Sequence, residues 1–80
     1  MYIKEIIEIL KEINPYIDIE EDTELIESEI LDSLSTIFLV TQLEDKFGIY
    51  VDEKLVLPEN FKTVKLINAM LQKCAEERTV

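Results

Sequence analysis

Apolar residues recur three or four positions apart in three stretches of the chain, which is the spacing of an amphipathic helix. The stretches cover residues 2–13, 33–47 and 64–76. A much shorter helical turn is expected over residues 57–61, where Pro58 suits the first position of a turn of helix. The pattern therefore predicts an all-α fold, a small bundle of three main helices plus one short helix.

Residues at the ends of these stretches supply helix start and stop signals. Asn14 precedes Pro15, and the residue before a proline is pushed out of the helical region, so the first helix ends there. Gly48 supplies the left-handed residue that ends the second helix, and Thr63 is the expected N-cap of the third. The positions expected to face a common core are Ile3, Ile6, Ile7, Leu10 and Ile13, then Thr36, Leu39, Val40, Leu43 and Phe47, then Phe61, Val64, Ile67, Met70 and Leu71.

A long connection over residues 15–31 joins the first two helices. It is rich in acidic residues, and a connection of this length in a compact domain is usually functional or partly ordered. Its sequence is compatible with one turn of helix over residues 24–27. Its apolar residues are expected to pin it across the helices, and they are Ile17, Ile19, Leu25, Ile26, Ile30 and Leu31.

The second helix also carries apolar residues on the side opposite its core stripe. At about 100° per residue, Leu34, Phe38, Thr41 and Asp45 fall on this outer side. An exposed pair formed by Leu34 and Phe38 indicates a docking surface for a partner, and we assign Ile37 to the same surface. Alternatively, the connection covers Phe38. The sequence leaves both interpretations open.

The candidate chemistry lies at the boundary between the connection and the second helix. Asp32 is a good N-cap, since its carboxylate accepts hydrogen bonds from the first free N–H groups of a helix. Ser33 is then the first helical residue, at the positive end of the helix dipole. A serine in that position is a favourable attachment point for a phosphate. We hypothesise that Ser33 carries a covalent prosthetic group through a phosphodiester, and that the rest of the chain presents it.

Composition indicates the class of protein. Eighty residues form one small domain, which we expect to span 1–80 with residues 77–80 frayed. The apolar fraction of 48% is ample for a core, and no apolar run is long enough to cross a bilayer. The start of the chain lacks the basic and apolar blocks of a secretory signal. A single cysteine, Cys74, fits a reducing compartment and excludes an internal disulfide, so we expect a cytoplasmic protein.

The net charge of −10, from 18 acidic and 8 basic residues, restricts the partners. It excludes nucleic acid, which requires a basic face, and it disfavours insertion into or binding to anionic membranes. It favours basic patches on partner proteins, because an acidic field steers their approach. Histidine is absent, so Ser–His and Cys–His pairs and histidine metal sites are impossible. The acidic run 18–24 lacks the glycine and ligand spacing of a calcium loop, and we expect no catalytic or metal site.

Four segments of the chain resemble the phosphopantetheine-binding carrier-protein family, which includes acyl carrier proteins and peptidyl or aminoacyl carriers. They are Leu31-Asp32-Ser33-Leu34, Phe47-Gly48-Ile49, Pro58-Glu59-Asn60-Phe61 and Thr63-Val64. The resemblance covers the chain from Leu25 to Leu71 and extends to size, acidity and helix order. The triplet Asp-Ser-Leu alone is a short match. Its position between a loop and a helix of matching length makes it specific.

The resemblance implies a function for these residues. A phosphopantetheinyl transferase moves 4′-phosphopantetheine from coenzyme A to Ser33, Asp32 is the acid that precedes it, and Leu34 begins the helix that partners recognise. The thiol of the arm holds acyl or aminoacyl groups as thioesters for fatty-acid, polyketide or nonribosomal-peptide biosynthesis. The protein is then a monomeric carrier and not an enzyme. Its other partners are a loading ligase and downstream synthases with basic or apolar docking patches.

Three residues depart from the family pattern. Glu29 stands where the family often has glycine, and Ser35 and Phe38 stand where carriers of fatty-acid synthesis usually have an acid. These departures favour an aminoacyl or specialised acyl carrier, of the peptidyl or D-alanyl kind. The alternative function is an acidic helical protein-interaction domain without a prosthetic group, in which Ser33 is only a residue at a helix start.

Overall fold

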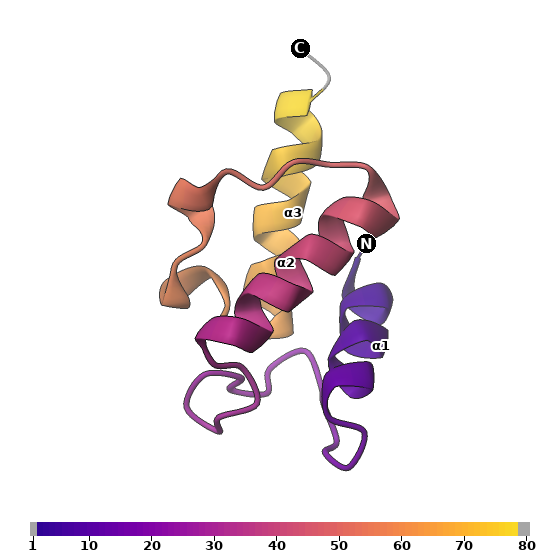
Figure 1. Ribbon diagram of the computed structural model, residues 1–80, viewed down its shortest axis with the longest axis vertical. Coiled ribbons are helices and arrows are strands. Elements are labelled where there is room, and N and C mark those ends of the chain that lie inside the picture. The colour runs from indigo at the N-terminus through magenta and orange to yellow at the C-terminus, as the bar shows by residue number, and fades with distance from the viewer. Residues whose placement is uncertain (1, 79–80) are drawn as a thin grey trace.

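The fold is a small helical bundle (Figure 1). The computed structural model describes residues 2–78, with side chains described to Glu76. Within that range there are three α-helices, two short 3₁₀ helices and no strand, in the order α1 (Ile3–Ile13), α2 (Ser33–Phe47), η1 (Glu53–Leu55), η2 (Pro58–Asn60) and α3 (Val64–Arg78). The predicted helical class and its three main helices are confirmed. The short helix expected near Pro58 is η2, whereas the hydrophobic pattern does not predict η1.

α1 packs against both α2 and α3 through one side. Its buried residues are Ile6, Ile9 and Leu10. The predicted core stripe of α1 was wrong in two respects. It omitted Ile9, which is buried, and it included three residues that are only partly buried, Ile3, Ile7 and Ile13. The backbone N–H of Tyr2 donates to Asn68 Oδ1 at 2.8 Å, which ties the start of α1 to α3. The helix ends before Pro15, as predicted.

Phe61 and one side of α3 complete the core. The fully buried residues there are the predicted Phe61, Val64, Ile67 and Leu71. Met70 and Cys74 are also buried, each with 4% of its surface exposed, so the cysteine fills space in the core. α3 extends to Arg78, two residues beyond the predicted end. Two of the four residues for which we predicted fraying are therefore helical, and residues 79 and 80 lie outside the described range.

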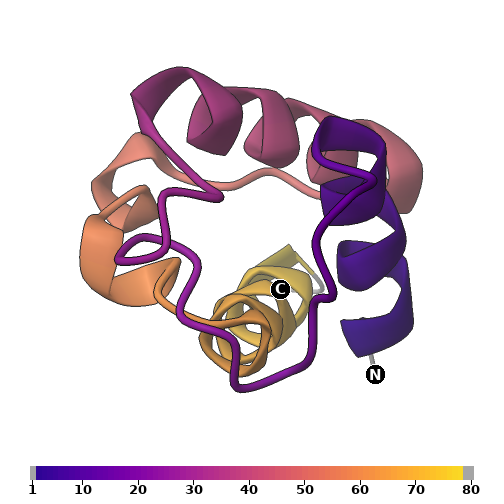
Figure 2. The ribbon, with the colours of Figure 1, turned by 90° about the horizontal axis from the view of Figure 1, so that it is seen from below.

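The connection between α1 and α2, residues 14–32, crosses the lower end of the bundle (Figure 2). Its apolar residues pin it there as predicted, because Ile19, Leu25, Ile30 and Leu31 are buried. Two backbone hydrogen bonds add to this, from Leu25 N to Lys62 O at 2.7 Å and from Lys65 N to Glu21 O at 3.1 Å. The helical turn considered at residues 24–27 is present as a single turn, closed by a hydrogen bond from Ser28 N to Glu24 O at 3.1 Å, and no helix continues from it.

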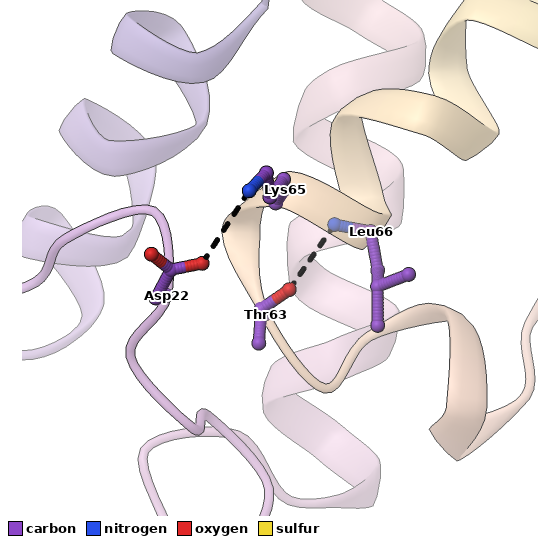
Figure 3. Close-up of polar contacts among 4 residues, drawn as sticks. All are labelled: Asp22, Thr63, Lys65 and Leu66. Carbon is purple, nitrogen blue, oxygen red and sulfur yellow. Dashed lines mark hydrogen bonds and ion pairs between the residues drawn. The ribbon is translucent and has the colours of Figure 1, made fainter.

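The connection also contacts the start of α3 (Figure 3). Thr63 Oγ1 accepts a hydrogen bond from Leu66 N at 3.2 Å, which confirms Thr63 as the N-cap. Lys65 Nζ lies 3.8 Å from Asp22 Oδ1. Because both side chains are well exposed, this ion pair contributes little to stability. The backbone bonds and the buried apolar residues are what hold the connection, and they fix the position at which α2 begins.

Candidate functional site

α2 begins as the sequence predicts, with Asp32 as its N-cap. Asp32 has an extended backbone (φ −116°, ψ −170°), and its Oδ1 accepts a hydrogen bond from Ser35 N at 2.8 Å. Its carbonyl oxygen accepts the first helical hydrogen bond, from Thr36 N at 2.9 Å. Ser33 is therefore the first residue of α2, and its side chain is exposed to solvent. The serine that the sequence singles out lies where an enzyme can reach its hydroxyl.

The cap also determines the charge beside Ser33. The hydrogen bond from the backbone N–H of Ser35 favours the carboxylate form, and it lowers the pKa of Asp32 from the ordinary value of 3.8. Asp32 is consequently negative at neutral pH. The free N–H groups of the first turn add a partial positive charge at the same place. Ser33 thus lies between a fixed carboxylate and the electropositive end of a helix.

A groove of about 470 Å³ runs beside Ser33, between α2 and the segment that holds η1 and η2. We call it the Ser33 groove. Asp32, Ser33 and Thr36 supply its polar wall. Its apolar lining is Ile26, Leu31, Ile37, Val56, Leu57, Pro58 and Phe61. Phe61 and Leu31 belong to the buried core, so the groove has a closed apolar floor.

The core side of α2 differs from the prediction at its two ends. Leu39, Val40 and Leu43 are buried as predicted. Thr36 is only partly buried and lies in the wall of the Ser33 groove, with its hydroxyl donating to Asp32 O at 2.7 Å. Phe47 is also partly buried, and it packs edge-on against Tyr2 with ring centroids 4.7 Å apart. Helix spacing alone cannot show that the polar Thr36 faces a groove and not the core.

The outer face of α2, defined as Leu34, Ile37 and Phe38, is apolar and exposed. The exposed fractions are 79% for Leu34, 58% for Ile37 and 46% for Phe38. The connection therefore does not bury Phe38, so the second of the two interpretations is wrong. Docking of a partner at this face stays a prediction. Phe38 and Leu34 also border a second, shallow groove shared with the end of α1, at Glu12 and Ile13.

The other two residues assigned to partner binding, Thr41 and Asp45, are both exposed further along α2. The Thr41 hydroxyl donates to Ile37 O at 3.0 Å, so this donor is used within the helix. Gly48 ends the helix in the left-handed conformation at φ 61°. The structure thus brings Leu34, Ile37 and Phe38 together near Ser33, while Thr41 and Asp45 lie one and two turns farther away.

The turn that precedes Ser33 contains a backbone feature that the sequence pattern did not reveal. Glu29 has φ 63°, the left-handed conformation, and no other non-glycine residue of the described range has a positive φ. Its N–H donates to Ile26 O at 3.1 Å, and Leu31 N donates to Leu25 O at 2.9 Å. The one available signal in the sequence was that the carrier family which the chain resembles often has glycine at this position. Leu57, in the wall of the groove, was also missed.

Comparisons with known proteins give no further assignment. A scan against protein-family models and searches of curated proteins and of solved structures each find no match. In the part of the chain that the structure describes, no three carboxylate or thiol side chains gather in a way that could hold a metal ion. None of the helices in residues 2–78 combines the length and apolar character that a membrane span requires.

Proposed function

We propose that this protein is an acyl carrier that bears 4′-phosphopantetheine on Ser33. The observation that carries the proposal is the position of Ser33, exposed at the first residue of α2 and directly after the capping Asp32. The free N–H groups of a helix start favour the negative charge of a phosphodiester. The Ser33 groove leaves open space beside the hydroxyl, so the residues present fit the group.

The prosthetic group would supply a thiol that holds an acyl or aminoacyl group as an activated thioester. The protein would supply the attachment point, the charge and the surfaces that partners recognise. A flexible tether raises the effective concentration of its cargo at a partner's active site. The partners of this proposal are a phosphopantetheinyl transferase, a loading ligase and downstream synthases, and the protein acts as a cytoplasmic monomer without catalysis of its own.

The outer face of α2 supports an aminoacyl or specialised acyl cargo over a fatty-acid cargo. Residues 33–43 contain no charged side chain, and Phe38 stands at a position where fatty-acid carriers usually have an acid. An enzyme that recognises an acidic helix would find no charge on this stretch. Partner choice depends on repulsion and mismatch as much as on attraction.

The experiment is modification by a purified broad-specificity phosphopantetheinyl transferase with coenzyme A and Mg²⁺. The intact mass is expected to increase by one phosphopantetheinyl group. Ser33→Ala should abolish the increase, and Ser35→Ala, which removes the neighbouring hydroxyl two residues along, should preserve it. An unchanged mass for the wild type, or an increase that survives Ser33→Ala, would reject the carrier. The acidic protein-interaction domain without a prosthetic group would then be the better description.

A further inference from the structure

The second groove beside α2 differs in character from the Ser33 groove. It lies between the end of α1 and the outer face of α2, and its volume is about 520 Å³. We call it the α1–α2 groove, and its lining residues are Glu12, Ile13, Leu34, Ser35 and Phe38. Three of these residues are apolar, and Glu12 is the one charged residue among them. The volume falls within the roughly 300–1,000 Å³ range of small-molecule sites.

Glu12 places a carboxylate at the edge of this groove. Its side chain is exposed in the last turn of α1. The neighbouring Lys11 lines a separate hollow on α1, together with Lys4 and Glu8, and is not part of the groove wall. An apolar surface with a single carboxylate beside it suits a ligand that combines an apolar group with a positive charge.

The α1–α2 groove lies within reach of Ser33. Leu34, the residue after Ser33, begins the groove wall on α2. Phe38 follows five residues after Ser33, about 7.5 Å along the helix axis. A phosphopantetheine arm contains two amide units and ends in a thiol, so it is longer than this distance when extended. A group held on that thiol can rest in the groove while the arm stays attached to Ser33.

The Ser33 groove suits a different kind of cargo. Its polar lining residues are Asp32, Ser33 and Thr36, which lie at the helix start where a phosphodiester would be attached. Its other lining side chains are apolar. Burial of an ammonium group among apolar side chains is costly, because no acceptor replaces its hydration. A positively charged cargo is therefore disfavoured there, whereas the α1–α2 groove keeps it beside a carboxylate and in contact with water.

We infer that the α1–α2 groove is a resting site for an aminoacyl group carried on Ser33. The α-ammonium lies beside Glu12, and an apolar side chain of the amino acid lies against Leu34 and Phe38. The inference rests on the proposed function and names its cargo class, an α-amino acid with an apolar side chain. Glu12 attracts the ammonium and repels acyl groups that end in a carboxylate. Apolar contact is available to any apolar cargo, so Glu12 is the source of selectivity.

Other occupants match the α1–α2 groove less well. A second copy of the chain would bring another net charge of −10, and like charges across an interface oppose association. A fatty-acyl group has no positive charge to place beside Glu12, and the Ser33 groove offers it a closed apolar floor. A partner that covers Leu34 and Phe38 during delivery would displace the aminoacyl group from the groove.

The test compares two cargoes that differ only in the α-ammonium. The full chain is loaded by the broad-specificity transferase from phenylalanyl-coenzyme A or from 3-phenylpropanoyl-coenzyme A, and the intact mass verifies each product. Backbone amide chemical shifts are compared with those of the protein modified from coenzyme A itself, at about pH 6, where an α-amino group is charged. The shift changes at Glu12, Ile13 and Phe38 should be about two- to fivefold larger for the phenylalanyl form, the difference that one exposed ion pair supports.

Three variants separate the charge from the apolar contact. Glu12→Gln keeps the size of the side chain and removes its charge, so the two cargoes should then give equal shift changes. Glu5→Gln, on the same helix and outside the groove lining, is the matched control and should preserve the difference. Phe38→Ala should reduce the shift changes at Glu12 and Ile13 for both cargoes, because it removes part of the apolar wall.

Three results would overturn the inference and leave the carrier function intact, since the mass shows loading. The first is equal shift changes, or none, at Glu12 for the two cargoes in the wild type. The second is shift changes at Ile26 and Leu57 instead, which would assign the cargo to the Ser33 groove. The third is shift changes that grow with protein concentration, which would assign the α1–α2 groove to a second copy of the chain. Failure to gain mass from coenzyme A would reject the carrier function, and this inference with it.

Discussion

Asp32 serves two purposes at the start of α2. Its carboxylate accepts the hydrogen bond from Ser35 N that begins the helix, and its charge stands next to the candidate attachment residue Ser33. The hydrogen bond lowers the pKa of Asp32 below 3.8. A carboxyl whose pKa is lower in the folded than in the unfolded protein contributes stability above its ordinary pKa. That contribution is lost as the pH falls through the lowered, folded-state value.

We therefore predict that Asp32→Asn lowers the thermal midpoint at neutral pH, and that the difference from the wild type shrinks below about pH 4. Asn keeps a capping oxygen and removes only the charge, which isolates the ionic part of the cap. The measurement is a series of thermal melts from pH 7 to about pH 3. Asp18→Asn, an exposed carboxylate of the connection, is the control. A difference that stays constant across this range would contradict the assignment.

Glu29 holds a conformation that a side chain disfavours. With φ 63° it lies in the left-handed region, which costs a residue with a Cβ roughly 1–2 kcal/mol relative to the right-handed one. Glycine adopts this region freely but loses more backbone entropy on folding, by roughly 0.5–1 kcal/mol. The buried neighbours Ile30 and Leu31, and the backbone bonds around them, hold Glu29 in place.

Glu29→Gly should consequently leave stability unchanged or raise it by up to about 1.5 kcal/mol, the difference between these two terms. Urea unfolding followed by circular dichroism measures the change. Glu27→Gly, two residues earlier and without a positive φ, is the control and should destabilise the protein. If both substitutions destabilise equally, the left-handed turn is not formed in solution.

At the scale of elements, α2 separates a core side from an outer face within one helix. Leu43 is completely buried, whereas Phe38 keeps 46% of its surface exposed. Both are large apolar residues, and their positions in the sequence differ by only five. Leu43 therefore packs in the core, whereas Phe38 is open to solvent, and recognition by a partner is its role only in the proposed function.

Leu43→Ala should cost about 2–5 kcal/mol through the cavity that it leaves, a large share of the stability of a domain this small. Phe38→Glu should cost about 1 kcal/mol or less, because roughly half of that side chain is already in water. Chemical denaturation measures both values. Phe38→Glu should also slow loading by the natural ligase or synthase. If Phe38→Glu unfolds the protein, Phe38 belongs to the core and the docking surface is wrong.

At the scale of the whole molecule, net charge opposes the compact state. Ten excess negative charges repel one another in the folded protein. The ion pairs Lys46–Glu8 at 3.9 Å and Lys65–Asp22 at 3.8 Å are exposed, so each contributes little. Added salt should therefore weaken the repulsion among the excess negative charges more than it weakens the attraction within these ion pairs. The bundle depends on its apolar core, which salt does not weaken.

We predict that raising NaCl from about 0.02 M to about 0.5 M increases the thermal midpoint. The control is Glu20→Lys/Glu21→Lys, two exposed residues whose reversal changes the net charge from −10 to −6, since each substitution adds two positive charges. This variant should be more stable than the wild type at low salt, and its thermal midpoint should change less when salt is added. A midpoint that falls with salt would mean that attractive pairs outweigh the repulsion.

Most of the helical structure could be read from local signals. The bounds of α2 follow from Asp32 and Gly48, and the end of α1 follows from Pro15, because capping and proline geometry act within a few residues. The core residues of α3 follow from their spacing. η1 was missed because its three residues include no buried side chain and therefore leave no periodic pattern. The side of α1 that faces the core, which includes Ile9, depends on how α2 and α3 pack against this helix.

The sequence by itself determined the helices, their caps, the acidic character of the protein and the place of Ser33 at the start of α2, because each depends on residues close together in the chain. Only the tertiary structure decided that Phe38 is exposed, that Thr36 faces a groove, and that Leu57 lies in the wall beside Ser33. These depend on how distant segments pack. The left-handed Glu29 also belongs to the tertiary structure, because buried residues on both sides of the turn impose a backbone conformation that its own side chain disfavours.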